Sequence, residues 1–321
     1  MIRVSSTLSI SVTSLRYQVL GKLGFGANST TWFCRDLSDH RYVAIKVYVR
    51  SPITQARINR EVDAFKHLAT VRSSHIGRRF IRNVLDSFEL ERPDGSHHHC
   101  LVHEPLRITL YDFQRLGGAL RHLLKTLDFL HMESSIAHCA SNIMLTVVDE
   151  SVFEDFERAE KEIMPGAIPV LCDFGEARIG ANHPHECIQP EIYRAPEILL
   201  ELSWSHRQLW AWDLLEQKYL FDGQDEEGYT NGYHIAEMVA YLGTPPLEFQ
   251  RRSIRSPLVF TDDGNWKGDP PLPPIALEGC EAKLQGSLKV AFLRFLRSIL
   301  TWVPDERKSA RELLQDPWLK A

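Results

Sequence analysis

A glycine pair, a lysine and two carboxylates follow one another along the chain in an order that suits phosphate chemistry. Gly24-x-Gly26 lies between two strand-like runs, and Lys46 ends the β-rich segment VAIK twenty residues further on. A strand lysine can meet the phosphates of a nucleotide that a glycine turn covers. Glu61 falls fifteen residues later in a helical segment, where it can pair with Lys46. Asp173 follows an apolar strand, where a carboxylate can hold Mg²⁺. The glycine pair alone would also fit an ordinary hairpin turn.

The elements that must position these residues change character near residue 105. Before it, runs such as YQVLGKLGFG and STTWFCRD predict strands, with one helical segment at 54–71. After it, apolar residues at helical spacing predict the helices ALRHLLKTLDFLHM, GYHIAEMVAYLG, LKVAFLRFLRSILTW and SARELLQDPWL. We therefore expect an α+β fold with a frayed N-terminus at 1–16, a small β-rich lobe at 17–105 and a larger helical lobe at 106–321.

The composition excludes several classes of protein. The chain has 321 residues, 44% of them hydrophobic, and a net charge of -5, which argues against nucleic-acid binding by bulk electrostatics. No run approaches the roughly 18 apolar residues that a membrane span needs. Six scattered cysteines without a C-x-x-C pair predict free thiols in a reducing compartment.

Two local patterns allow more than one interpretation. The opening MIRVSSTLSISVTS has one arginine, many hydroxyls and no acid, which fits a transit peptide weakly and favours a frayed N-terminus. GSHHHC, at 95–100, offers histidines for a metal. Adjacent histidines on a strand point to opposite faces, however, so we expect a polar hairpin turn after RPDG.

Two further motifs complete a set. YRAPE spans Tyr193 to Glu197, and PDERKSARELL contains Arg307. With the glycine turn, VAIK, the helical glutamate and DFG, they stand in the order of the protein kinase signature, and the chain resembles a eukaryotic protein kinase over nearly its whole length. KLGFGANSTTWFCRD, CLVHEPL, YLFDG and GNWKGDPPLPP are similar to SR-protein kinases, particularly the fungal-type relatives. Ser29 stands where most kinases carry a third glycine.

The resemblance implies a two-lobed protein kinase fold with ATP and Mg²⁺ in a cleft near residue 105. By this resemblance Lys46 would hold the α- and β-phosphates, and Glu61 would orient Lys46. Asp173 and Asn142 would hold Mg²⁺. The remaining nucleotide contacts would come from the glycine loop (Gly24, Phe25, Gly26, Ala27, Asn28 and Ser29), from Ala44, and from the backbone of Glu104 to Leu106. His103 would lie behind the adenine, and Glu197 would form a buried structural ion pair with Arg307.

The catalytic loop departs from the family pattern. Active kinases carry His-x-Asp, then four residues, then Asn, with a lysine nearby. Here His138 is followed by Cys139, Ala140, Ser141 and Asn142, so three residues are missing and neither the acid nor the lysine is present. A serine hydroxyl is a poor base at neutral pH, and a cysteine is an implausible proton acceptor here.

Two more shortenings accompany this one. The helix that should open with Asp-x-Trp has Gln208-Leu209-Trp210 instead, and another gap falls after YDFQR. Asp213 aligns with the far end of that helix and does not replace the acid. Glu176, directly after DFG, is the nearest carboxylate in sequence to the metal site and is a weak candidate for the base.

These observations leave several hypotheses open. The first is a serine kinase of the SR-protein type that is impaired in this chain. The alternative is a pseudokinase that binds a nucleotide or docks partners. The same gaps would also arise in a mis-spliced or mis-predicted form of an active kinase, and loss of core helix would give an unstable fragment.

The resemblance also implies partners and location. The substrates would be Ser/Arg-rich proteins such as splicing factors, with no direct contact to nucleic acid or membrane, and the chain would be a monomer in the cytoplasm, the nucleus or both. No serine or threonine occurs between Asp173 and Glu197, so Ser/Thr phosphorylation of this segment is unavailable. The acidic runs DESVFEDFERAEKE and DGQDEE would attract a basic substrate, although they fit solvated surface equally well.

Overall fold

The computed structural model describes most of the chain, and the described residues form two compact units. The described residues are 9–12, 14–91, 95–109, 116–138, 143–146, 169–180, 183, 191–204, 219–281 and 284–320. The first unit contains those up to 72, those at 79–109, and those at 143–146 and 169–176. The second contains 73–78, 116–138 and those from 177 onward.

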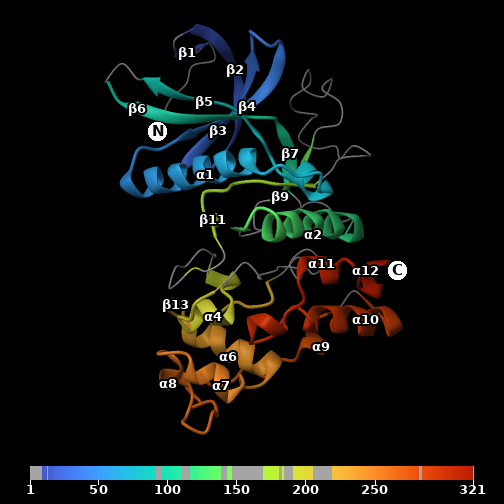
Figure 1. Ribbon diagram of the computed structural model, residues 1–321. Coiled ribbons are helices and arrows are strands. Elements are labelled where there is room, and N and C mark those ends of the chain that lie inside the picture. Colours follow the sequence, from blue (N-terminus) through green and yellow to red (C-terminus); the bar gives the residue numbers. More distant parts are fainter. Residues whose placement is uncertain are drawn as a thin grey trace. The chain divides into compact units, whose positions relative to one another are not determined.

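The first unit is built around a six-stranded antiparallel sheet with the strand order β1-β2-β3-β4-β6-β5 (Figure 1). Its strands are β1 (Ser9–Val12), β2 (Ser14–Phe25), β3 (Ser29–Asp36), β4 (Arg41–Tyr48), β5 (Val84–Glu91) and β6 (His97–His103). The strands predicted before residue 105 are confirmed. β1 differs from the frayed terminus expected over 1–16, because its backbone pairs with β2 from Ser9↔Gln18 to Val12↔Ser14.

The polar hairpin predicted around the histidine run is present. β5 and β6 pair in register from Glu91↔His97 to Val84↔His103, with one irregularity near its base. His99 Nδ1 lies 2.7 Å from Glu89 Oε1 on the neighbouring strand, and His98 Nδ1 lies 2.8 Å from the Tyr48 carbonyl oxygen. His99 therefore contacts the partner strand of the hairpin, and His98 contacts the backbone of β4.

The helix predicted at 54–71 is α1 (Pro52–Thr70). It begins where Ser51 accepts a hydrogen bond from the Thr54 amide, with proline in the first turn. One stripe of the helix is buried, at Thr54, Ile58, Glu61, Ala64 and Leu68. The spacing of three to four residues explains why a glutamate lies on the buried stripe among apolar side chains.

A second, three-stranded sheet completes the first unit. Its order is β10-β9-β7, from β7 (Leu106–Thr109), β9 (Ile143–Thr146) and β10 (Pro169–Leu171). Leu106, Val170 and Cys172 form its small apolar cluster. The compact unit thus contains strands beyond residue 105. The division into lobes at 17–105 and 106–321 stays a prediction.

The second unit is mainly helical, as predicted. Its longer helices are α2 (Leu116–Met132), α6 (Asn231–Leu242) and α10 (Gly286–Arg297). Shorter helices are α4 (Pro196–Leu199), α7 (Leu247–Arg251), α8 (Ser256–Val259), α9 (Leu277–Cys280), α11 (Ala310–Leu313) and α12 (Pro317–Lys320). The short strand pairs are β8 (Ile136–Ala137) with β11 (Arg178–Ile179), and β12 (Gln224–Asp225) with β13 (Gly228–Tyr229). Turns of 3-10 helix are η1 (Ile76–Phe80), which crosses the unit boundary, η4 (Glu191–Tyr193) and η5 (Pro304–Glu306).

The core of the second unit follows the apolar spacing of its helices. α2 buries Leu120, Leu123, Leu124, Leu127 and Leu130. Such an apolar stripe must pack against other elements. α2 also contacts α11, because Asp128 accepts a hydrogen bond from Arg311 at 3.1 Å. In the described part of the chain, no helix is long and apolar enough to cross a membrane.

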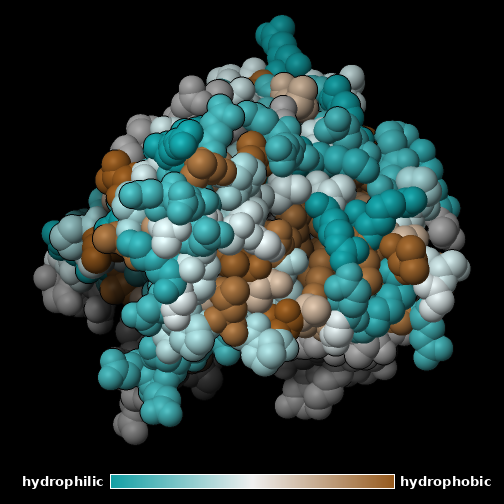
Figure 2. Space-filling model, turned by 90° about the horizontal axis from the view of Figure 1, so that it is seen from below, coloured by the Kyte–Doolittle hydropathy of each residue, from teal (hydrophilic) through white to brown (hydrophobic). Residues whose placement is uncertain are grey.

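Some apolar side chains of the second unit remain exposed. Figure 2 shows brown atoms gathered in one face of the molecule and bordered by teal ones. In the second unit, Ile254 of the α7–α8 connection is 77% exposed, Val290 of α10 is 69% exposed and Leu258 of α8 is 64% exposed. Single exposed apolar residues are normal on protein surfaces, so exposure by itself assigns no role to these three.

His234 of α6 makes the stability of this unit depend on pH. The side chain is buried, with Nδ1 2.8 Å from the Tyr229 hydroxyl and its ring against Phe221. The pKa of His234 is lowered to about 3. Burial is the main cause, and the positive charge of Arg194 contributes to the lowering. Above the unfolded-state pKa of about 6.5 both states are neutral. Below it only the unfolded chain takes up the proton, so stability falls as the pH falls towards 3.

We therefore expect His234 to remove about 2 kcal/mol of unfolding free energy between pH 7 and pH 5. Urea unfolding at both pH values measures the loss, with His234→Gln as the variant that cannot titrate. The variant should lose about 2 kcal/mol less than the wild type over the same interval. Equal losses in the two proteins would contradict the prediction.

Candidate active site

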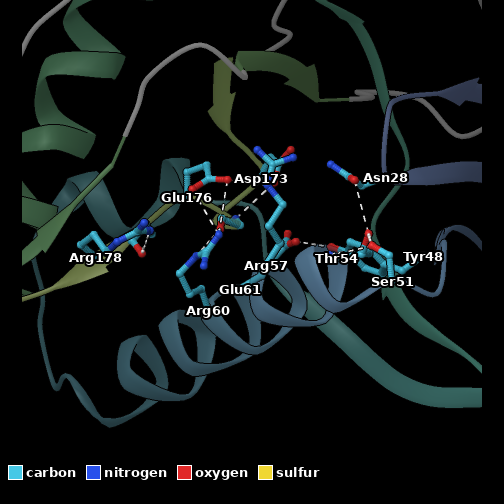
Figure 3. A network of polar contacts seen from close by, with 12 residues as sticks. Asn28, Tyr48, Ser51, Thr54, Arg57, Arg60, Glu61, Asp173, Glu176 and Arg178 are labelled. Carbon is cyan, nitrogen blue, oxygen red and sulfur yellow. Dashed lines mark hydrogen bonds and ion pairs between the residues drawn. The ribbon is translucent and has the colours of Figure 1, made fainter. Parts of the chain in front are cut away.

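The predicted lysine and carboxylates meet in the first unit. Lys46 Nζ lies 3.0 Å from Glu61 Oε2 and 3.3 Å from Asp173 Oδ1. Glu61 and Asp173 are labelled in Figure 3. Glu61 is buried, whereas the Asp173 side chain is 45% exposed. One ammonium group therefore contacts a buried carboxylate on a helix and an accessible one that lies 127 positions after the lysine in the sequence.

The elements explain this meeting. Alternate residues of a strand face the same side, so Lys46 and Tyr48 of β4 both point towards α1, where Tyr48 packs with Ile58. Glu61 comes from the buried stripe of the same helix. On the other side, β10 delivers the chain to Asp173.

The turn after β10 is shaped by Asp173 itself. Its φ is 59°, a left-handed conformation that is rare outside glycine but tolerated by aspartate. The turn is stabilised because Asp173 Oδ1 accepts a hydrogen bond from the Gly175 amide at 3.2 Å. A Cβ at Gly175 would lie 3.2 Å from the same carboxylate oxygen, so a larger residue there would require a small shift of the Asp173 side chain.

Tyr48 contacts both Lys46 and Glu61, although its sequence context does not mark it as a site residue. Its hydroxyl donates a short hydrogen bond to Glu61 Oε2, and the Lys46 ammonium lies 4.9 Å from the centre of its ring. Burial, followed by the charge of Glu61, raises the pKa of Tyr48 and keeps the hydroxyl protonated. The sequence signal for Tyr48 is its position two residues after Lys46, because residues i and i+2 of a strand face the same side.

The glycine loop is a hairpin that is tied to α1. Gly26 donates its amide hydrogen to the Ser29 carbonyl at 2.9 Å, and Phe25 is 82% exposed. At the tip, Asn28 Oδ1 accepts a hydrogen bond from Thr54 Oγ1 at 3.3 Å. A Cβ added at Gly24 or Gly26 would meet no atom within 4 Å, so the backbone there is open to a neighbouring group. Ala27 continues the turn between Gly26 and Asn28. The arrangement fits a loop that covers phosphates.

The segment predicted to contact adenine lies at the end of β6. His103 pairs with Ala44 across β4 and β6, and its Nδ1 lies 2.9 Å from the Asn83 carbonyl oxygen. Burial lowers the pKa of His103 well below its usual value, and the charge of Arg82 adds to this effect. Arg82 also donates to the Glu104 carbonyl at 3.0 Å. Leu106 is buried in the cluster of the three-stranded sheet.

The catalytic-loop residues are only partly described. His138 is buried in the second unit, directly after β8. Asn142, the second predicted Mg²⁺ ligand, lies outside the described residues, as do 139–141. The same holds for Gln208-Leu209-Trp210 and Asp213.

Glu176 has a different environment from that of a general base. Its carboxylate is bound by Arg57 and Arg60 of α1, so its oxygens are engaged by guanidinium groups. The weak candidacy of Glu176 for the proton acceptor therefore finds no support in its contacts.

The remaining predicted contact is structural. Arg307 donates to both carboxylate oxygens of Glu197, from Nη1 at 2.7 Å and from Nη2 at 2.5 Å. Both side chains are buried in the second unit. The predicted buried ion pair is confirmed.

The chain belongs to the protein kinase domain family, whose pattern it matches over residues 17–319. It has the two-lobed protein kinase fold, with a β-sheet N-terminal region and a helical C-terminal region, and is a serine/threonine protein kinase domain. Such domains use ATP and Mg²⁺ in general. The oxygen chemistry of Asp173 and the open glycine turn fit these groups.

Among its relatives is a serine/threonine protein kinase of Aspergillus fumigatus, which is 41% identical over 95% of this chain and 85% of that protein. Serine/threonine-protein kinase AFC3 of Arabidopsis thaliana is 26% identical over 95% of the chain and 82% of that protein. Dual specificity tyrosine-phosphorylation-regulated kinase 3 of Mus musculus is 25% identical, with 95% of the chain matching 54% of that protein.

The matches with these three relatives run over more positions than this chain has residues. The comparison with the A. fumigatus kinase runs over 348 positions, although this chain has only 321 residues. The comparisons with the A. thaliana and M. musculus kinases run over 343 and 345 positions. Each relative therefore has residues at positions where this chain has none.

Proposed function

We propose that this chain is an ATP-binding serine kinase domain of the SR-protein type whose phosphoryl transfer is impaired. The observation that carries nucleotide binding is the contact of one lysine, Lys46, with both Glu61 and Asp173. A lysine in this position offers a fixed positive charge to phosphates, and an accessible aspartate beside it offers oxygen to Mg²⁺.

Each residue then has a defined task. Lys46 binds the α- and β-phosphates, while Glu61 and Tyr48 fix its position. The glycine loop from Gly24 to Ser29 covers the phosphates, and the backbone of Glu104 to Leu106 meets adenine. Asp173 and Asn142 would hold Mg²⁺, which would neutralise charge on the transferred phosphate.

The impairment follows from the short catalytic loop. Between His138 and Asn142 the chain has no carboxylate and no lysine. The active-kinase pattern has six residues between the histidine and the asparagine, whereas this chain has three. Nucleotide binding and catalysis are separable, because phosphoryl transfer depends on positioning and electrostatics at several independent groups.

Substrate choice rests on the motif similarity to SR-protein kinases and on charge. The turn between β12 and β13 exposes Glu226 and Glu227, where arginines of a Ser/Arg-rich substrate find carboxylates. A second acidic run, 149–162, lies outside the described residues. We propose residence in the cytoplasm, the nucleus or both, where such substrates occur, and action as a monomer.

The first test measures phosphate transfer from labelled Mg²⁺-ATP to a Ser/Arg-repeat peptide. A Ser/Glu-repeat peptide of equal length is the substrate control. Little or no labelling above that of Lys46→Met, together with binding of Mg²⁺-ATP, supports the proposal. Full activity that is lost in Lys46→Met would show that other residues complete the site and that impairment is the wrong conclusion.

Lys46→Met is expected to weaken Mg²⁺-ATP binding about tenfold, because a charge-assisted contact to the phosphates is lost. Adenosine, which has no phosphate, should bind the variant and the wild type equally. Calorimetric titration with both ligands measures the difference. Unchanged ATP affinity in the variant would remove Lys46 from the phosphate site.

The second candidate is a pseudokinase that docks a partner, which the short loop without an acid or a lysine favours. A third explanation is a mis-spliced or mis-predicted form of an active kinase. Sequencing the transcript separates them: a message that encodes His-x-Asp with four residues before Asn would rule out the pseudokinase.

A further inference from the structure

The segment after Asp173 is bound to α1 by a cluster of ionic and polar contacts. Arg57 Nε donates a short hydrogen bond to Glu176 Oε1, and Arg60 Nη2 lies 3.3 and 3.4 Å from the two carboxylate oxygens. Arg60 Nε also donates to the Gly175 carbonyl at 2.9 Å. Figure 3 shows these side chains meeting above the helix.

The spacing on α1 makes this arrangement possible. Arg57 and Arg60 are three positions apart, so they lie on adjacent turns of one face and reach the same carboxylate. Arg60 directly precedes Glu61, so one helical turn carries both the arginine that binds Glu176 and the glutamate that binds Lys46. The three charged side chains of this cluster are 29–37% exposed, which leaves them partly protected from solvent.

Two connections therefore link the same pair of elements. Lys46 joins Glu61 on α1 to Asp173, and the arginines join α1 to Glu176 three residues further on. If α1 moved away from the segment, the Lys46 ammonium would lose one of its carboxylates. The second connection opposes that movement and favours the geometry in which phosphate and metal contacts coexist.

The charge that binds the arginines is encoded in the sequence. No serine or threonine lies between Asp173 and Glu197, so phosphorylation at such residues cannot supply an anion there. Glu176 supplies it permanently, at the first position after DFG. We infer that Glu176, bound by Arg57 and Arg60, is a positioning residue that holds α1 and Asp173 in the nucleotide-binding geometry without a phosphorylation step.

This inference rests on the proposed nucleotide binding, and its test compares two ligands. Glu176→Gln is expected to weaken Mg²⁺-ATP binding about fivefold, the lower end of typical coupling between sites. Adenosine affinity should not change, because adenosine uses neither Lys46 nor Asp173. A general loss of structure would weaken both ligands alike, and that result would overturn the positioning role.

A matched control and a coupling experiment make the test specific. Glu201→Gln breaks an exposed ion pair with Arg255 in the second unit and should leave both affinities unchanged. Combining Arg57→Gln and Arg60→Gln should weaken ATP binding at least as much as Glu176→Gln does, because Arg60 also binds the Gly175 carbonyl, and adding Glu176→Gln to that pair should have no further effect. Additive losses would show that the residues act separately and would overturn the inference.

Hydrogen exchange distinguishes failure of this inference from failure of the proposed function. If the wild type binds no ATP, the proposed function fails, whereas the contacts of α1 can still be measured. Backbone amides of α1 should then exchange faster in Glu176→Gln than in the wild type and in Glu201→Gln. Unchanged exchange in α1 would overturn the positioning role regardless of nucleotide binding.

Discussion

A chain in which residues 139–141 are replaced by a six-residue segment with aspartate second and lysine fourth is expected to transfer phosphate at least about 100-fold faster than the natural chain. The aspartate would accept or orient the proton of the substrate hydroxyl, and a general acid or base contributes roughly 10²–10⁴-fold. The lysine would steady the γ-phosphate, which is charge stabilisation in addition to proton transfer.

The measurement is the initial rate of label transfer to the Ser/Arg-repeat peptide at saturating Mg²⁺-ATP. The same six-residue segment with asparagine in place of the aspartate is the control, since it restores the loop length without the acid. It should remain close to the natural chain. Equal rates in the natural and repaired chains would contradict the prediction and would mean that the missing residues do not limit catalysis.

Arg307→Ala is expected to lower the unfolding free energy by about 3–5 kcal/mol, because it leaves a buried carboxylate without its partner. Glu197 is 1% exposed and receives two hydrogen bonds from the guanidinium. The arginine also donates from Nε to the Thr301 carbonyl at 3.1 Å, so its loss leaves a backbone acceptor unsatisfied as well.

Urea unfolding followed by tryptophan fluorescence tests this, since Trp302 and Trp318 lie in the same unit. Arg255→Ala is the matched control: it breaks an exposed pair with Glu201 and should cost less than about 1 kcal/mol. A loss of similar size in both variants would show that the buried pair contributes no more than an exposed one.

The elements of this fold are strongly marked in the sequence because their spacing is regular. The α1 stripe from Thr54 to Leu68 and the apolar runs of β4 and α2 are local patterns, and each predicts its own element without knowledge of the rest. Lys46 and Glu61 were predicted as a pair for the same reason, since they stand on two such elements that a known family joins.

The contacts between segments that are distant in the sequence are not indicated by local patterns. Nothing in the neighbourhood of Glu176 indicates that its partners are Arg57 and Arg60, 119 and 116 positions away. Tyr48 was overlooked because a tyrosine on a strand fits ordinary burial, and only the position of Glu61 opposite its hydroxyl makes it a hydrogen-bond donor. The ordered pairing of β1 likewise depends on β2 offering a free edge, not on the composition of 9–12.

By itself, the sequence determined the family, the order of strands and helices, and the absence of an acid between His138 and Asn142. These properties are written in residue types and local spacing. Only the tertiary structure decided which charged groups satisfy one another. A buried or half-buried charge takes the partner that packing places within hydrogen-bonding distance, and packing joins segments that are far apart in the chain. That is why the carboxylate of Glu176 lies against two arginines of α1, a pairing that the local sequence does not indicate.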